Sequence, residues 1–332
     1  MKLLAGDLGG TKTHLAIVEK HSGQYQLLHE QRYSSAQYPH LRNILHDFLQ
    51  EMQIKPQELH AACIGVAGPV ESFADHQQSK ITNLPWDVDS RDLQTHTGIA
   101  KIKLINDFQL IGYGIDALQP EELVTLLPGV SEAKGNRVFL GAGTGLGTGF
   151  GVWNDAVNAH QVLASEGGHM DFAPCNEKQR ALLAYLAAKH SHIPYEYLLS
   201  GQGILNICKG LSALGSAPPE IVAILQQADA PAQISQLALE HQSSFASDVM
   251  EVFTEIFAQQ CANLALLFLP TNGVYIAGGI APKIQTLMAS EHFRNAYFNK
   301  DNMNALLTKF PVYLITNPSI GILGAAVAAS RH

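Results

Sequence analysis

Three glycine-rich turns, each directly after a predicted strand, have the composition of phosphate-binding loops. They lie at residues 6–11, 141–147 and 278–279, and in the first two a threonine stands beside glycine. Glycine permits positive φ angles and lets a ligand approach backbone N–H groups, and several converging N–H groups form a nest for an anion. Each turn alone is more typical of a tight hairpin, but the three together favour phosphate binding.

These turns match neither of two common nucleotide-binding motifs. A P-loop requires glycine directly before lysine, whereas Thr11 precedes Lys12. A Rossmann fingerprint that begins at Gly141 would need glycine where Leu146 stands. Both of the longer turns also precede predicted strands, whereas those motifs open helices. Any phosphate site here is therefore of another type.

Two carboxylates stand where predicted strands end. Asp7 lies in the first glycine turn, and a carboxylate beside a phosphate nest repels phosphate unless Mg²⁺ lies between them, directly or through water. The alternative is that Asp7 hydrogen-bonds its own turn. Asn106 and Asp107 lie where a strand leads into a helix, a pair that in isolation is typical of a helix N-cap. Beside phosphate loops, such a carboxylate suits phosphoryl transfer, where it accepts the proton of the attacking hydroxyl.

The hydrophobic pattern assigns these residues to a series of α/β elements. We expect strands at residues 2–5, 13–18, 61–67, 102–105, 137–140, 148–153, 273–277 and 311–315. Helices are expected at residues 41–52, 108–117, 178–189, 195–211, 220–228, 245–269 and 321–330. Strand, glycine turn and strand occur twice, roughly 135 residues apart, which indicates a weak internal duplication. Residues 120–135 are predicted to be a loop that connects the two halves.

The composition excludes several classes of protein. The chain has 332 residues, 46% of them apolar, and a net charge of −8, and this length favours two globular domains. An acidic balance without a basic run argues against nucleic acid as a partner. The longest apolar run, Ile320 to Ala329, is about half of the ~20 residues that a membrane helix needs. Four widely separated cysteines, and a first strand that leaves no room for a signal segment, predict a cytoplasmic protein.

Six segments, in their order along the chain, resemble bacterial glucokinase. They are Asp7–Thr11, Ile105–Phe108, Gly141–Gly147, Glu166–Pro174, Leu199–Gly201 and Ile276–Ile280. The resemblance spans nearly the whole chain, and the combination is far more specific than any single loop. It implies a two-domain, actin-like (ribonuclease-H-like) ATPase fold of the α/β class, whose domains close over ATP and sugar across an interdomain cleft. It also implies a homodimer.

The resemblance further implies how the chain is divided and where Mg-ATP binds. A smaller N-terminal α/β domain, residues 1–117, would be completed by the C-terminal helix in residues 319–332, and residues 118–318 would form the larger α/β domain. Magnesium would be held by Asp7, through water. Since only Cys175 follows the Glu-x-x-His segment, where related sugar kinases carry a cysteine-rich motif, no structural zinc is expected. The ATP phosphates and adenosine would be held by Gly6, Asp7, Leu8, Gly9, Gly10, Thr11, Gly143, Thr144, Gly145, Gly278 and Gly279.

By the same resemblance, five polar side chains bind the acceptor sugar: Asn106, Asp107, Glu166, His169 and Glu196. Asp107 would be the general base for the glucose 6-hydroxyl, and Asn106 would hold a neighbouring hydroxyl. Sugar hydroxyls both donate and accept, so their pocket needs fixed carboxylates, amides and an imidazole. Glu166 and His169 flank two glycines, which is consistent with a tight loop. Glu196 alone is typical of a solvated helix surface, and only the segment after it supports its assignment.

The expected activity is that of an ATP-dependent glucokinase, which converts glucose and ATP to glucose 6-phosphate and ADP. A kinase for mannose, fructose or an N-acetylhexosamine stays open, because five polar positions do not determine the stereochemistry of one hydroxyl. Polyphosphate stays open as the donor. A sugar-sensing regulator of this fold would carry a helix-turn-helix before the first strand, which here begins at Lys2. An actin-like ATPase without a sugar acceptor would not need the polar set.

Overall fold

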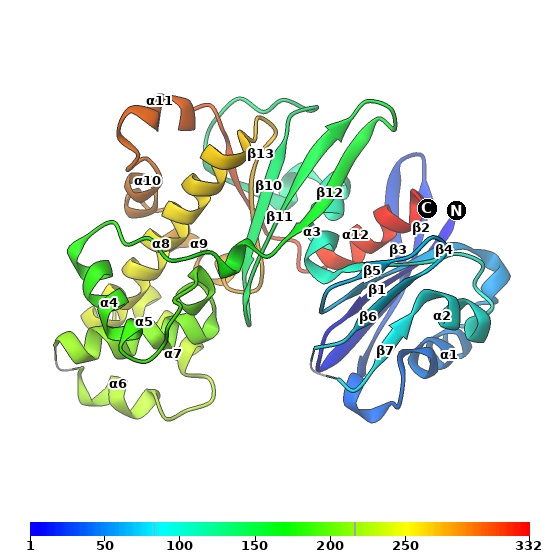
Figure 1. Cartoon of the computed structure of the whole chain (residues 1–332), viewed down its shortest axis with the longest axis horizontal. Helices are drawn as coiled ribbons and strands as arrows, with labels where there is room; N and C mark the ends of the chain where they lie inside the picture. Colours follow the sequence, from blue (N-terminus) through cyan, green and yellow to red (C-terminus); the bar gives the residue numbers. More distant parts are fainter. Residues whose placement is uncertain (83, 216) are drawn as a thin grey trace. The chain divides into compact units, whose positions relative to one another are not determined.

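The computed structural model describes residues 1–82, 84–215 and 217–332. The chain divides into two compact units (Figure 1). The first unit comprises Met1–Glu122 together with Asn317–His332, and the second comprises Leu123–Thr316. The boundaries expected from the sequence were after residue 117 and before residue 319. Each unit contains a mixed sheet with both parallel and antiparallel strand pairs, and helices that pack against the sheet.

Among the described residues of the first unit, the main sheet has five strands in the order β3-β2-β1-β4-β8. β1 pairs antiparallel with β2 and parallel with β4, and β8 is parallel to β4. Leu8, Val66 and Asn106 are aligned across the three parallel strands, so the segments that follow them begin at one edge of the sheet. The strands are β1 (Lys2–Leu8), β2 (Lys12–His21), β3 (Gln24–Ser34), β4 (Leu59–Val66) and β8 (Ile102–Asn106).

Side chains of β1 alternate between two cores, one on each face of this sheet. Leu4 and Leu8 pack in a core with residues of α1 (Leu41–Glu51) and α2 (Ser90–Thr97). Leu3 and Ala5 pack on the other face, with α3 (Asp107–Gly114) and α12 (Ile320–Ser330). Because successive residues of a strand point to opposite faces, Asp7 lies on the face that α3 and α12 cover.

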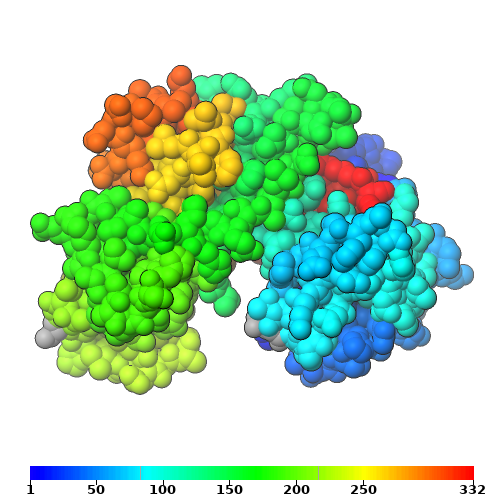
Figure 2. All heavy atoms as spheres, viewed as in Figure 1, coloured from blue at the N-terminus to red at the C-terminus, as the bar shows by residue number. Residues whose placement is uncertain are grey.

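The C-terminal helix α12 packs against α3 at short range. A Cβ on Gly324 would overlap the carbonyl oxygen of Leu110, and one on Gly114 would lie 2.5 Å from the carbonyl oxygen of Ile320. Most residues of α12 are buried, and only a small red area of the C-terminal segment is visible in Figure 2. Glycine and alanine at the crossing therefore make α12 part of the core of the first unit.

Residues 123–215 and 217–316 contain a six-stranded sheet in the order β12-β11-β10-β13-β14-β9. β10 pairs antiparallel with β11 and parallel with β13, as β1 does with β2 and β4. The duplicated strand–turn–strand pattern in the sequence thus corresponds to two hairpins with the same place in two sheets. The strands are β9 (Leu123–Leu127), β10 (Arg137–Ala142), β11 (Leu146–Asn154), β12 (Ala159–Ser165), β13 (Gly273–Ala277) and β14 (Val312–Ile315).

Helices of the second unit pack around α8, whose Phe253 and Phe257 are fully buried. None of the helices in the described parts of the chain is long and apolar enough to cross a membrane. The helices are α4 (Glu177–Ala187), α5 (Gly201–Leu214), α6 (Pro219–Ile224), α7 (Ala230–Leu239), α8 (Ser244–Phe268), α9 (Gln285–Met288), α10 (Glu291–Tyr297) and α11 (Asn304–Leu307).

The structure corrects two expectations about local elements. Residues 120–135, predicted to be a loop, contain the short edge strand β9, which pairs with β14; its partner is almost 190 residues away in the sequence, so no local pattern revealed it. The helix predicted over residues 195–211 is a 3-10 turn at Tyr195–Tyr197 followed by α5. Ser200 separates the two because its hydroxyl accepts the N–H of Gly203 and caps α5.

Candidate active site

The first glycine turn closes the β1–β2 hairpin at the edge of the sheet in the first unit. The N–H of Gly9 donates to the carbonyl of Lys12 at 3.0 Å. The buried Ser35 holds the turn from behind: its N–H donates to the Thr11 carbonyl at 3.0 Å and its hydroxyl to the Gly9 carbonyl at 3.2 Å. Thr11 is exposed, and Gly9 and Gly10 are partly exposed. The turn is therefore fixed on its inner side and accessible on its outer side.

Gly6 and Leu8, which the sequence placed with this phosphate turn, belong to β1 and are buried. A Cβ on Gly6 would lie 3.0 Å from Leu15 and 3.2 Å from Ile64, so glycine allows the close packing of β1 with its neighbours. The Leu8 side chain lies in the core. Because the N–H of Gly9 already donates to the Lys12 carbonyl, the groups of this turn that can reach a phosphate are those of Gly10 and Thr11.

Asp7 is a partly buried carboxylate beside the N-terminus of α12. A Cβ on Gly321 would lie 3.2 Å from its Oδ2. Burial, and to a smaller extent the charge of Asp107, raise the pKa of Asp7 from 3.8 to about 6. A carboxylate that is desolvated near a second carboxylate is stabilised by a divalent cation, so the donor set around Asp7 fits magnesium.

Asn106 combines a capping role with a fixed orientation. Its Oδ1 accepts the N–H of Phe108 at 3.0 Å, and its N–H donates to Oε1 of Gln109 at 3.2 Å, which together form a capping box for α3. Its Nδ2 donates to the Gly68 carbonyl at 3.3 Å. Asp107, the first residue of α3, accepts the Phe108 N–H on Oδ1 at 2.8 Å. Asn106 and Asp107 therefore have the N-cap role that the sequence offered as the alternative interpretation. The sugar-binding role is expected of the same two residues.

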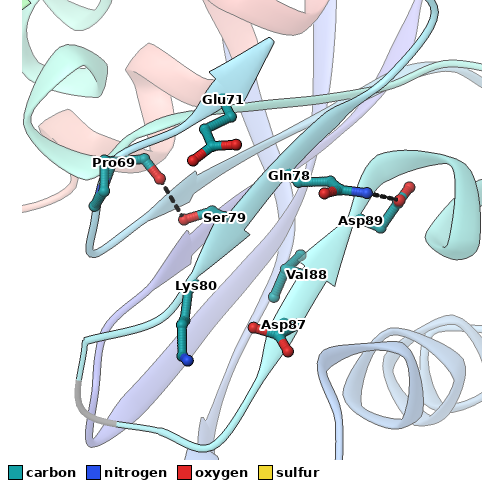
Figure 3. Close-up of a pocket in the computed structure, with 8 residues that line it drawn as sticks. All are labelled: Pro69, Glu71, Gln78, Ser79, Lys80, Asp87, Val88 and Asp89. Carbon is teal, nitrogen blue, oxygen red and sulfur yellow. Dashed lines mark hydrogen bonds between the residues drawn. The ribbon is translucent and has the colours of Figure 1, made fainter. Parts of the chain in front are cut away.

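A cavity of about 310 Å³ lies in the first unit beside the Gly68–Pro69 turn (Figure 3). The Ser79 hydroxyl donates to the Pro69 carbonyl at 2.9 Å, and the Gln78 amide donates to Asp89 at 2.7 Å. Ser79 thus holds the same Gly68–Pro69 turn that orients Asn106, and no sequence-predicted site residue lines the cavity. The lining residues are Pro69, Glu71, Gln78, Ser79, Lys80, Asp87, Val88 and Asp89.

In the second unit, the Gly143–Gly145 turn borders a cavity of about 400 Å³ with a largely apolar wall. Gly143, Thr144 and Gly279, all predicted to hold the nucleotide, line it together. A Cβ on Gly143 or Gly279 would meet no described atom within 4 Å, so both backbones face open space. The other lining residues are Gly201, Ile204, Pro231, Ala232, Ser235, Gln236, Leu239, Ile280, Lys283 and Ile284.

Gly278 and Gly145 lie behind this cavity and serve close packing. Gly278 has φ +87°, and a Cβ there would overlap the Ala142 carbonyl oxygen. A Cβ on Gly145 would lie 2.5 Å from Oε2 of Glu196. The same Oε2 accepts the N–H of Leu146 at 2.9 Å. Glu196 is therefore bound to the glycine turn itself, a contact that the sequence did not reveal.

Glu166 precedes a tight 3-10 turn and His169 is its last residue, in agreement with the tight loop expected from their spacing. Both are exposed, whereas Gly167 and Gly168 between them are buried. The Gly167 N–H donates to the Ser165 hydroxyl at 3.1 Å. A Cβ on Gly168 would overlap the carbonyl oxygen of Leu146. Leu146 is thus contacted twice within the second unit, by Glu196 and by the turn that carries Glu166 and His169.

Magnesium at Asp7, as expected from the sequence, would require ligands beyond the protein. Within residues 1–82, 84–215 and 217–332, no group of three or more His, Cys, Asp and Glu side chains could hold a metal ion. Mg²⁺ typically keeps several waters and binds through one or two carboxylates plus phosphate oxygens. Asp7 beside an accessible glycine turn agrees with that mode of binding.

Comparison with known proteins identifies the family. A family model described as Glucokinase matches residues 4–332. The chain is 39% identical to the glucokinase of Trichormus variabilis over 345 residues, which covers 99% of both proteins. The chain belongs to the glucokinase family. As a member of this family it is an ATP-dependent hexose kinase.

Solved structures of glucokinases share this fold over the full chain. The glucokinase of an Antarctic psychrotroph has a TM-score of 0.86 at 26% identity and covers 100% of this chain and 99% of its own. A ROK-family glucokinase from Streptomyces griseus, in complex with glucose and AMPPNP, has a TM-score of 0.65 at 19% identity and covers 100% of both chains. These matches confirm the expected α/β, actin-like fold class of the glucokinase family.

The glucokinase-family motifs did not reveal all residues that line the cavity beside Gly143. Pro231, Ala232, Ser235, Gln236 and Leu239 come from α7, for which the sequence predicted no helix. Asp229 and Pro231 around its first turn are a helix-start signal that would have located it. Nothing in the sequence indicates that this helix borders a glycine turn almost 90 residues before it.

Proposed function

We propose that this protein transfers the γ-phosphate of ATP to the 6-hydroxyl of glucose, with Asp107 as the general base. The observation that carries this assignment is the placement of Asp107. It stands at the first position of α3, after a strand end aligned with that of β1, and near enough to Asp7 to raise the pKa of that carboxyl. A base and a magnesium-binding carboxylate are the two acidic groups that phosphoryl transfer needs.

The nucleotide assignment is supported by the cavity of the second unit. Its largely apolar wall suits a purine, and the open backbone of Gly143 and Gly279 allows a ligand to approach closely. The Streptomyces griseus protein binds AMPPNP and glucose, and ATP is accordingly the donor we propose here. Gly10 and Thr11 of the first unit would contribute further phosphate contacts.

In this mechanism the side chains position the sugar and move one proton. The 6-hydroxyl oxygen forms a bond to the γ-phosphorus while the bond to the ADP oxygen breaks, and the hydroxyl proton passes to the Asp107 carboxylate. Asn106, held by Gly68 and Phe108, would orient a neighbouring hydroxyl. Glu166, His169 and Glu196 would bind the remaining hydroxyls. Bound magnesium would neutralise charge on the phosphates, with Asp7 as its protein ligand through water.

A sugar panel tests the proposal directly. The protein is incubated with Mg-ATP, and ADP release is measured with glucose, mannose, fructose, N-acetylglucosamine or no sugar. We expect release that depends strongly on glucose. A preference for another sugar would leave the hexose kinase activity in place and change the proposed substrate. Equal ADP release without any sugar would contradict the proposed acceptor site. Replacing ATP by polyphosphate in the same assay tests the donor.

The homodimer belongs to the proposal as well. It follows from the family resemblance, and light scattering at several protein concentrations measures it. A mass near twice 35.9 kDa is expected, and a monomer at all concentrations would contradict it.

A further inference from the structure

We propose that Glu196 is a positioning residue for the nucleotide-side glycine turn and that it couples sugar binding to nucleotide binding. This inference deepens the proposed function, because it takes the Gly143–Gly145 turn to be the nucleotide site. Glu196 was predicted only as a sugar ligand. Its contacts within the second unit assign it this additional role.

One carboxylate oxygen of Glu196 is committed to the turn. Oε2 accepts the N–H of Leu146 at 2.9 Å, and a Cβ on Gly145 would lie 2.5 Å from the same atom. Glycine at position 145 therefore makes room for this carboxylate. A hydrogen bond between a charged carboxylate and a backbone N–H is stronger than one between neutral groups, so it restricts the backbone where the turn enters β11.

The segment that carries Glu196 is itself fixed and contacts the turn a second time. The Ser200 hydroxyl donates to the Glu196 carbonyl at 2.8 Å. The N–H of Gly201, the first residue of α5, donates to the Gly143 carbonyl at 2.9 Å. The segment thus holds the turn at both ends, at Gly143 and at Leu146, and a shift of Glu196 displaces one end of it.

The other oxygen of Glu196 remains available to a sugar. Oε1 accepts no hydrogen bond from any residue in the described parts of the chain. Leu146, which Oε2 binds, also contacts Gly168 through its carbonyl, in the turn that carries Glu166 and His169. A hydroxyl bound to Oε1 would reduce the freedom of the carboxylate and hence of the turn. By linkage, a bound nucleotide would then favour the sugar by the same factor.

Nucleotide affinity measured without sugar distinguishes this role from that of a sugar ligand alone. Calorimetric titration with Mg-ADP is carried out on the wild type, Glu196→Ala, Glu196→Gln and the control Glu220→Ala. A hydrogen bond to a charged group contributes ~1.5–3 kcal/mol, so loss of the Leu146 bond predicts roughly 10- to 100-fold weaker ADP binding in Glu196→Ala. Glu196→Gln keeps an acceptor for Leu146 and is expected to bind within about 3-fold of wild type. The control, on α6, should be unchanged.

A double-mutant cycle with Gly145→Ala tests the contact itself. The new methyl group would displace Glu196, so Gly145→Ala is expected to weaken ADP binding strongly in the wild type and much less in the Glu196→Ala background. If Glu196→Ala fails to fold, the cycle is carried out in Glu196→Gln, where the methyl group should have nearly its full effect. Additive losses in the Glu196→Ala background would contradict the contact.

The coupling is tested by repeating the ADP titrations with saturating glucose. We expect glucose to tighten ADP binding in the wild type and to leave it unchanged in Glu196→Ala. If Glu196→Ala binds ADP like the wild type in the absence of sugar, the positioning role is wrong. Failure of the wild type to bind ADP would instead contradict the proposed function, so the two failures are distinguishable.

Discussion

Asp107 raises the pKa of Asp7, although burial of Asp7 has the larger effect, and together they bring this carboxyl from 3.8 to about 6. Asp7 is the last residue but one of β1, and Asp107 directly follows β8, whose end is aligned with that of β1 in the same sheet. With a pKa of about 6, Asp7 is thus mostly ionised at neutral pH, although burial and the charge of Asp107 both disfavour its charged form. This arrangement favours cation binding at the expense of stability.

We therefore expect Asp7→Asn to stabilise the metal-free protein at neutral pH. A folded-state pKa above the unfolded value means that the contribution of Asp7 to stability is full below pH about 4 and is lost as pH rises through 6. A shift of about two units corresponds to on the order of 2–3 kcal/mol. Thermal unfolding in EDTA should show a higher Tm for Asp7→Asn at pH 8 and little difference at pH 4. Equal destabilisation of Asp7→Asn at pH 4 and pH 8 would contradict this expectation. The kinase activity of the variant should fall, because it lacks the carboxylate expected to bind magnesium.

Replacement of Asp107 separates catalysis from binding. Asp107→Asn keeps an oxygen that accepts the Phe108 N–H, so α3 should retain its N-terminus. Loss of the general base should lower kcat by about 10²–10⁴-fold. Glucose binding, measured by titration without ATP, should change little. Near-normal turnover would remove Asp107 from the role of base.

Two substitutions of Asn106 separate its capping role from its sugar contact. Asn106→Ala removes the acceptor for the Phe108 N–H, and loss of an N-cap lowers the free energy of unfolding by about 1 kcal/mol. Asn106→Ser restores a capping oxygen but cannot reach Gly68 as the amide does. Denaturant unfolding should show recovery of stability in Asn106→Ser, while the KM for glucose stays raised in both. Recovery of both quantities would mean that Asn106 acts only as a cap.

The cavity beside Gly143 can be filled from α7. Ala232 lines it and is exposed, so Ala232→Trp should fold normally and occupy part of the ~400 Å³. We expect a KM for ATP raised at least tenfold and unchanged glucose binding in the absence of nucleotide. Ala223→Trp, at an exposed position of α6 outside the cavity, is the matched control. An unchanged KM in Ala232→Trp would place the nucleotide elsewhere.

Much of the fold could be predicted because its patterns are local. The strand–glycine turn–strand pattern located β1–β2 and β10–β11, and the apolar periodicity located α1 and α8. The same holds for Asn106 and Asp107, whose place between strand and helix depends on a few neighbouring residues. Edge strand β9 was missed because a short edge strand is stabilised mainly by partners remote in the sequence. Helix α7 was missed because its apolar periodicity is weak, although Asp229 and Pro231 mark its start.

The sequence by itself determined the residue types from which the chemistry was predicted: glycine turns, a carboxylate near a strand end, a second carboxylate at a helix start and a set of polar side chains. Only the tertiary structure decided how these groups are used. It buried Gly6 and Leu8 in a sheet, brought Asp107 near Asp7, bound Glu196 to Leu146 and placed α7 beside Gly143. Residue types and short spacings define what a side chain can do, whereas burial, pKa and contact between distant segments arise when the sheets and helices pack.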